Sequence, residues 1–232
     1  MGKTIDKEDR LPCPICNKDE IHNPELTEPG TNIGNGQTLA KALMKEFYGK
    51  KPANSHPLSS GKRARCAQAH HLICSESMDD DEWGMICSVF GYDVNCKENG
   101  IMLPADMRVA CELKIPLHKG DHSSTSTHII GLNYVDAVKG LIDSVKKKAK
   151  RKGYCEPEEY KTLMADLNSK SKLIWQNVKS FAWTISSDGR DYVSGGIGCA
   201  GVTSIPAKQG HMCPAGRAHN LNVQPGTYFL EQ

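Results

Sequence analysis

The chain has 232 residues, of which 29 are basic and 27 acidic, so its formal net charge is only +2. This near balance excludes binding of polyanions by the protein surface as a whole, and any affinity for phosphate must come from local clusters of charge. No apolar run approaches the roughly 18 residues that a membrane-spanning helix needs, so no membrane partner is expected.

Residues 1–16 carry charges and lack the apolar stretch of a secretory signal peptide. We therefore expect a protein that is made in the cytoplasm and that leaves, if exported, by a specialised route. In that compartment the 10 cysteines are expected to be metal ligands or buried thiols rather than disulfides.

The first third of the chain is predicted to be mostly irregular. Residues 1–36 are rich in Gly, Pro and Asn, apart from the Cys-Pro-Ile-Cys at Cys13 to Cys16. Residues 37–48 place apolar side chains at helical spacing and predict a short helix. Residues 49–65 read as an exposed basic linker.

A strand, a helix and a returning strand are predicted next. The apolar-flanked segment 66–75 suits a strand, and residues 83–90 suit a short helix. A turn at Asn99-Gly100 then leads into residues 101–103, which suit a strand that returns beside the first.

Two longer helices and a β-rich tail complete the prediction. Residues 134–145 carry one apolar face and continue into the basic run 146–152, and residues 156–180 show the same spacing. Residues 182–202 alternate in a β-like manner around a hairpin turn. The expected fold class is α+β, with an N-terminal region 1–61, a core 62–152 and a C-terminal region 153–232.

The adjacent pair His70-His71 is the first candidate for chemistry. Neighbours in a strand point to opposite faces, but at a strand end both side chains can turn into one cleft. Phosphodiester cleavage uses both kinds of imidazole, one as a ligand of a divalent metal and one as the acceptor of a proton from water.

Two further features support a metal site. His118 and His122 are four residues apart, which on a helix would let both bind one metal, although Gly120 and Asp121 favour an exposed loop instead. Asn99 lies in the turn before the second strand, where its amide would orient a histidine ring directly or through nearby backbone. The alternative is an ordinary turn asparagine beside Gly100.

In this order and spacing, the motifs resemble the AHH nucleases of the HNH/endonuclease VII superfamily. The similarity covers about residues 66–145. It is carried by Ala69-His70-His71-Leu72-Ile73, Gly91-Tyr92-Asp93-Val94-Asn95, Glu98-Asn99-Gly100-Ile101-Met102-Leu103-Pro104, His118-Lys119-Gly120-Asp121-His122 and Tyr134 to Val138.

This resemblance implies a ββα-metal core and a single divalent ion, for which imidazole ligands suit Zn, Ni, Mn or, less well, Mg. His70, His118 and His122 would be the metal ligands, His71 the general base, and Asn99 the residue that orients the base. The chain departs from the family in having Cys74 where a proline is usual. The extra segment 123–133 also adds His128 as a rival ligand.

The resemblance also implies a biological role. Such nucleases are often the toxic part of a bacterial effector that is exported by a secretion system, borne by a carrier and accompanied by an immunity protein. The expected activity is cleavage of DNA in a target cell, with 5′ phosphate and 3′ hydroxyl products. An RNase of the same architecture and a zinc-stabilised binding module remain alternatives.

Basic residues on both sides of the histidines are candidates for contacts with phosphate, which would give little sequence preference. A solvated charged face is the alternative. The candidates are Lys62, Arg63, Arg65, Lys146, Lys147, Lys148, Lys150 and Arg151.

The spacing of Cys13 and Cys16 also suits a second, structural zinc. The closing ligands expected by composition are His211 and Cys213, with His219 nearby, which would join the two ends of the chain. Two other cysteine pairs compete for this role, namely Cys66 with Cys74 and Cys96 with Cys111.

Overall fold

The structure is a computed structural model, and it describes residues 12–18, 22, 26, 28–50, 67–105, 110, 116–118, 122, 132–156, 159–179, 182, 183 and 185. The helices are α1 (Gly36–Lys50), α3 (Asp81–Phe90), α5 (Tyr134–Lys152) and α6 (Tyr160–Lys179). The strands are β1 (Ala67–His71) and β2 (Gly100–Pro104), and two short 3-10 turns, η3 (Ser75–Met78) and η4 (Lys97–Asn99), accompany them.

These bounds confirm the predicted strands and helices to within a few residues. The hairpin predicted in 182–202 lies almost wholly outside the described residues, as do the basic linker and the C-terminal tail. Within the described part, β1, β2 and α5 follow one another as an α+β unit with the predicted ββα order.

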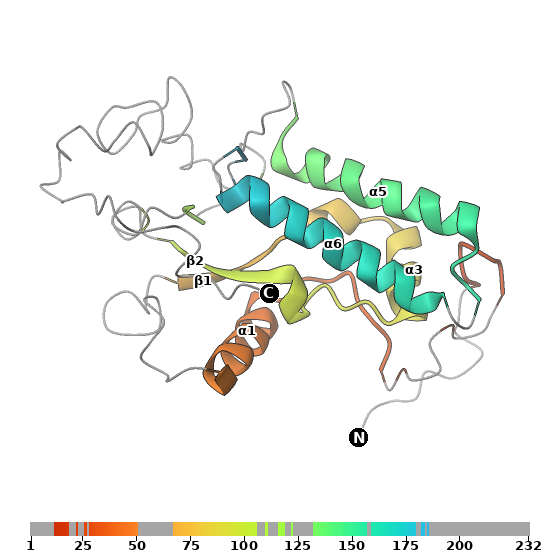
Figure 1. The fold of residues 1–232 in the computed structure, drawn as a ribbon, viewed down its shortest axis with the longest axis horizontal. Coiled ribbons are helices and arrows are strands. Elements are labelled where there is room, and N and C mark those ends of the chain that lie inside the picture. Colours follow the sequence, from red (N-terminus) through yellow and green to blue (C-terminus); the bar gives the residue numbers. More distant parts are fainter. Residues whose placement is uncertain are drawn as a thin grey trace, which may run out of the picture.

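The two strands form an antiparallel pair in which His70 lies opposite Ile101 and His71 opposite Gly100. Helix α1 packs below this ribbon, and α5 and α6 lie above it (Figure 1). Gly100 is required here because Leu39 of α1 packs against its backbone, in the space that a Cβ atom would occupy. The end of β1 that carries the histidine pair is therefore enclosed between helices.

Helix α5 has well-defined ends and one buried face. The side chain of Asn133 accepts a hydrogen bond from the backbone N–H of Asp136, and Gly153 ends the helix in the left-handed conformation at φ 67°. Val138, Ile142 and other apolar residues of this helix are buried in the core. The 19 residues of this helix extend for about 28 Å. No helix of the described part is long and apolar enough to cross a membrane.

Candidate active site

Three histidines meet beside the N-terminal end of α5. One nitrogen from each of His70, His118 and His122 lies within 4.8 Å of the others. The ring centroids of His70 and His118 are 4.7 Å apart, and those of His70 and His122 are 5.2 Å apart. The structure thus brings together the three residues proposed as ligands from the sequence, and His128 lies outside the described residues.

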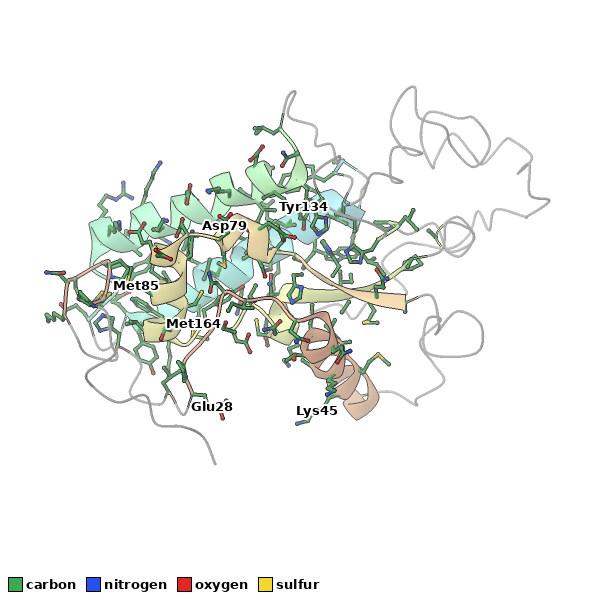
Figure 2. All side chains as sticks on the ribbon, turned by 180° about the vertical axis from the view of Figure 1, so that it is seen from behind. Glu28, Lys45, Asp79, Met85, Tyr134 and Met164 are labelled. Carbon is green, nitrogen blue, oxygen red and sulfur yellow. The ribbon has the colours of Figure 1, made fainter. Side chains whose placement is uncertain are left out.

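His70 is held in a single tautomer by Tyr134, the first residue of α5, which Figure 2 labels at the end of the helix nearest the strands. The Tyr134 hydroxyl donates its one proton to the carbonyl oxygen of Leu72 at 2.6 Å. It must therefore accept a hydrogen bond from Nε2–H of His70, which is 3.0 Å away. The Nδ1 atom of His70 then carries the lone pair that a metal needs.

That Nδ1 atom is buried and has no hydrogen-bond partner among the described residues. Burial lowers the pKa of His70 well below its usual value, and the neighbouring charges of His118 and His122 lower it further. A neutral imidazole with an unsatisfied, buried acceptor is costly unless something binds it. A divalent cation fits this position.

His118 and His122 complete the set from the segment that follows β2. The backbone N–H of His118 donates to the carbonyl oxygen of Pro104 at 2.9 Å, which ties this residue to the end of β2. Its Nδ1 is also buried without a partner in the described part, and burial lowers its pKa to about 4. In His122, Nδ1 lies 2.6 Å from the carbonyl oxygen of Ile185, so Nδ1 carries the proton and donates it.

Neither His118 nor His122 lies in a helix, which corrects the expectation that a helical i, i+4 pair presents them. A bond to the last residue of β2 and a bond to Ile185 position the two rings instead. Because the candidate donors are three imidazoles, the set suits Zn, Ni or Mn better than Mg. Three protein ligands also leave coordination positions for water and a phosphate oxygen.

His71, the expected general base, follows His70 in β1 and is half-buried. Its Nε2 lies 3.0 Å from Oδ1 of Asn95. The amide nitrogen of Asn95 donates to the carbonyl oxygen of Ile33 and to Asp93, so the oxygen is the atom that faces the ring. A carbonyl oxygen only accepts, so Nε2 of His71 carries the proton and Nδ1 carries the lone pair.

The electrostatics around His71 keep that lone pair available. Burial lowers the pKa of His71, partly opposed by the hydrogen bond to Asn95 and by the charges of Glu76 and Asp93. The charge of His122 also lowers the pKa of His71, so the ring lies within electrostatic reach of the cluster. The His71 imidazole is therefore neutral at neutral pH, with its lone pair on Nδ1, as a general base must be.

The loop before α1 lies against the Nδ1 edge of His71. A Cβ atom on Gly34 would lie 3.4 Å from Cε1 and 3.6 Å from Nδ1 of His71. The loop is held by two bonds, from Gly34 N–H to Ser75 Oγ and from Asn35 N–H to Asn95 Oδ1, each 2.6 Å long. A Cβ atom on Gly34 would also overlap Ser75 Oγ, so a glycine is required for the loop to lie this close to the Nδ1 edge of His71.

Asn99 is fully buried and bonds to backbone and to the Ser171 hydroxyl of α6 rather than to a histidine ring. Its Oδ1 accepts from Ile73 N–H at 2.7 Å, and its Nδ2 donates to the carbonyl oxygens of Ile73 and Val94, both at 2.9 Å. Of the two arrangements expected from the sequence, a direct bond to a histidine ring and a bond to nearby backbone, the structure has the second. Asn99 joins the segment after the histidine pair to the segment that carries Asn95.

Sequence reasoning missed the roles of Asn95, Gly34 and Tyr134. Asn95 and Tyr134 were both among the motif residues of the family resemblance, but neither was given a role at the site. An asparagine in a turn gives no local signal of its partner, because the residues that it bonds are distant along the chain.

Ion pairs within the protein engage much of the basic run 146–152. Lys146 is nearly buried over the Trp83 ring and pairs with Glu82 at 2.9 Å and Asp80 at 3.4 Å. Lys148 pairs with Asp166 at 2.7 Å, and Lys150 pairs with Glu82. Each of these three cations therefore has an acidic partner within the protein, and its expected contact with phosphate stays a prediction.

Lys147 and Arg151 make no ion pair in the part of the chain that the structure describes, so they remain candidates for contact with phosphate. Thirteen residues of helix separate Lys147 from Tyr134, which is about 20 Å along the axis. Lys62, Arg63 and Arg65 lie outside the described residues.

Most of the residues expected to close the Cys13 and Cys16 site cannot be placed. His211, Cys213 and His219 lie outside the described residues, and so do Cys66 and Cys111. Cys74 and Cys96 are free thiols that do not join Cys13. The residues that the structure places beside Cys13 and Cys16 are His22 and Cys155.

Comparison with known proteins identifies one family. Residues 52–170, just over half of the chain, match the model of a nuclease family of the HNH/ENDO VII superfamily with conserved AHH. The match includes Ala69-His70-His71, His118, His122 and Tyr134. No curated protein and no solved structure gives a significant match.

Proposed function

This chain belongs to the AHH nucleases of the HNH/ENDO VII superfamily, and on that premise we propose that it is a metal-dependent DNA endonuclease with little sequence preference. Membership makes it a nuclease that acts on nucleic acid. The observation that carries the metal dependence is the buried, unpartnered Nδ1 of His70, in one group with His118 and His122.

The proposed reaction is hydrolysis of a phosphodiester bond. Nδ1 of His71 takes a proton from a water molecule, while Nε2–H stays bound to Asn95 Oδ1. The water oxygen forms the new bond to phosphorus as the bond to the 3′ oxygen breaks, and the 3′ oxygen takes up a proton from solvent, which leaves a 5′ phosphate and a 3′ hydroxyl. The cation bound by the three histidines would neutralise negative charge on the phosphate and on the departing oxygen.

Several features support DNA cleavage without base recognition. The residues that face the proposed reaction centre are imidazoles and amides suited to water and phosphate, and the remaining candidate cations, Lys147 and Arg151, suit contacts with the backbone. Phosphate contacts carry no sequence information.

We further propose that the nuclease is an antibacterial effector, delivered by a specialised secretion system with the help of a carrier. In the producing cell, an immunity protein would neutralise it. The support is the family resemblance. Induced expression in a bacterial cytoplasm should then kill the cell and fragment its DNA, whereas the His71→Ala chain should be tolerated. Survival of cells that express active, soluble wild-type protein would contradict the toxin role.

The test of the enzymatic proposal is cleavage of supercoiled plasmid by purified protein. Activity should require an added divalent metal and stop with a chelator, and His71→Ala should lower the rate by roughly 100-fold to 10,000-fold. Ser144→Ala, which removes an exposed hydroxyl bonded only to its own helix, is the matched control. Both variants should keep the wild-type melting temperature.

Other outcomes of this test have definite meanings. Degradation of RNA with plasmid left intact would replace DNA by RNA as the substrate. Cleavage that survives complete metal removal would overturn the metal dependence. Inactivity towards both nucleic acids, with unfolding of His71→Ala, would mean that the histidines hold the fold.

A further inference from the structure

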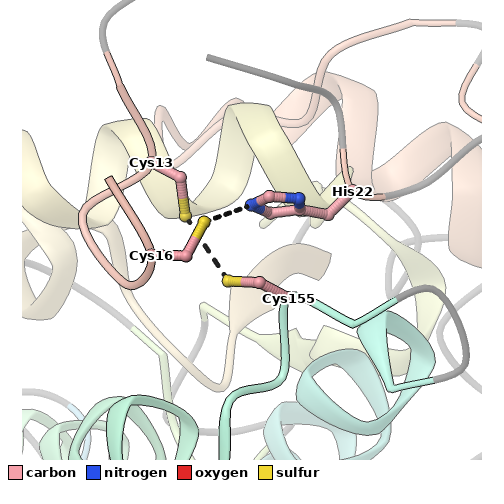
Figure 3. A group of neighbouring side chains, drawn as sticks. All are labelled: Cys13, Cys16, His22 and Cys155. Atoms are coloured by element: carbon pink, nitrogen blue, oxygen red, sulfur yellow. Dashed lines mark hydrogen bonds between the residues drawn. The ribbon is translucent and has the colours of Figure 1, made fainter. Parts of the chain in front are cut away.

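A second group of potential ligands lies at the other end of α5. Cys13, Cys16, His22 and Cys155, here called the Cys3His cluster, each place one ligand atom within 4.8 Å of the other three (Figure 3). Cys13 Sγ is 3.8 Å from Cys155 Sγ, and Cys16 Sγ is 3.3 Å from His22 Nε2. Cys13 and His22 are buried.

These separations match a tetrahedral zinc site. With Zn–S near 2.3 Å and Zn–N near 2.05 Å, tetrahedral angles place two sulfurs about 3.8 Å apart and a sulfur and a nitrogen about 3.6 Å apart. A disulfide would instead bring two sulfurs to about 2.05 Å. All three cysteines are free thiols.

The backbone around Cys13 and Cys16 is already folded as a metal-binding turn. The N–H of Ile15 points at Cys13 Sγ at 3.4 Å, and the N–H of Asn17 donates to the Cys13 carbonyl oxygen at 2.8 Å. Asn17 has φ 59°, a conformation that asparagine tolerates better than most residues. An N–H directed at sulfur favours the thiolate form that binds zinc.

The other two ligands are supplied by separate parts of the chain. Cys155 lies in the turn between α5 and α6, directly after the helix end at Gly153. His22 packs beside Phe90 at the end of α3, with ring centroids 5.2 Å apart. The cluster therefore joins residues 13–22 to the helical layer, across 142 positions of sequence in the case of Cys13 and Cys155.

We propose that the Cys3His cluster binds one structural Zn²⁺ that fastens the N-terminal segment to the α5–α6 turn. Three thiolates and one imidazole fill a tetrahedral shell and leave no position for substrate. Binding releases the protons of the three thiols to solvent as the sulfurs bind the ion. The site is separate from the histidine cluster, because the 19 residues of α5 between them span about 28 Å.

The first experiment uses the wild-type chain, purified under reducing conditions with zinc as the only added metal. Each cysteine is alkylated before and after chelation, and the modified positions are identified by mass spectrometry. Cys13, Cys16 and Cys155 should be protected at least 10-fold until the chelator removes the zinc. Equal alkylation with and without zinc, or a disulfide that joins any two of the three cysteines, would overturn the proposal.

A second experiment replaces zinc with Co²⁺, whose bonds to thiolates give intense near-ultraviolet absorption. His118→Ala, which disables the histidine cluster, should retain one cobalt and this absorption. Cys155→Ser should lose most of it, and the matched control Cys87→Ala, a buried cysteine outside the cluster, should keep it. Absorption that depends on His118 instead of Cys155 would assign the thiolate signal elsewhere and refute the site.

The two proposals fail independently. Loss of cysteine protection says nothing about plasmid cleavage, and an inactive protein that still protects the three thiols with zinc would leave the structural site intact. If Cys155→Ser does not fold, the alkylation of wild-type protein still decides the question.

Discussion

The two clusters at the ends of α5 differ in the completeness of their ligand sets. At the N-terminal end, three imidazoles converge from β1 and from the segment after β2, with two buried nitrogens that have no partner in the described part. At the C-terminal end, three thiols and one imidazole are enough to close a tetrahedron. An incomplete set leaves room for water and phosphate, whereas a complete set serves only to hold segments together.

The surroundings of the clusters differ in the same sense. Three of the four histidines at the first end have a partner that selects their proton position, namely Tyr134 for His70, Ile185 for His122 and Asn95 for His71. At the second end the local bonds shape the backbone turn around Cys13 instead. The contacts at the first end fix the proton positions of histidine rings, whereas those at the second end fix the backbone of the turn that carries Cys13.

Substituting one ligand in each cluster in turn should give the largest contrast in activity and stability. His118→Ala should reduce plasmid cleavage by at least about 1,000-fold with little change in melting temperature, since it removes a ligand of the proposed catalytic metal. Cys155→Ser should keep activity per folded molecule but lower the melting temperature by roughly 5–10 °C. Cleavage assays and calorimetry on both variants would check this, and similar profiles for the two would break the comparison.

Acid should weaken the metal-free protein through the histidine cluster. Burial lowers the pKa of His118 to about 4. Between pH of about 6.5 and about 4, His118 is therefore protonated in the unfolded chain but not in the folded chain. Stability should fall as pH drops from about 6.5 to about 4, by about 3 kcal/mol for this residue. Urea unfolding across that range would measure it.

The control for the acid effect is His118→Phe, which keeps a ring of similar size but has no titrating group. The slope of stability against pH should be smaller in this variant by about one proton. An unchanged slope would assign the acid sensitivity to other groups.

Tyr134→Phe should weaken the first cluster without touching the second. The change removes the hydroxyl that bonds both Nε2 of His70 and the carbonyl oxygen of Leu72. Loss of such a supporting bond lowers metal affinity by about 10-fold to 100-fold. Titration with Mn²⁺ should detect this loss, while protection of the three clustered cysteines by zinc stays at the wild-type level.

The smallest effect is expected at the loop beside His71. Gly34→Ala should reduce cleavage by roughly 10-fold, because the new methyl group would overlap Ser75 Oγ and move the loop that lies against Nδ1 of His71, and disturbing a well-placed proton acceptor costs at least this much. Metal affinity should not change, since Gly34 does not contact the histidine cluster. Gly36→Ala is the matched control, because a Cβ at Gly36 meets nothing within 4 Å. Equal activity of the two variants would show that Nδ1 is not approached from this side.

The sequence was sufficient for much of the fold. The apolar spacing in residues 134–145 predicted α5, and the pattern around Ile101 predicted β2, because each depends on interactions between residues a few positions apart. The basic run 146–152 was also visible, but most acidic partners of its lysines come from other elements, Glu82 from α3 and Asp166 from α6. Only the packing of α3 and α6 beside α5 decided which of these cations have an acidic partner within the protein.

The amino-acid sequence by itself determined which residues were available for chemistry, namely the histidine pair at a strand end and the candidate ligands His118 and His122. The tertiary structure decided which nitrogen of His70 carries a lone pair, that Asn95 rather than Asn99 bonds the ring of His71, and that Cys155 and His22 join Cys13 and Cys16. Local patterns follow from short-range sterics and burial, whereas a proton position or a ligand partner depends on atoms that meet only when distant segments pack.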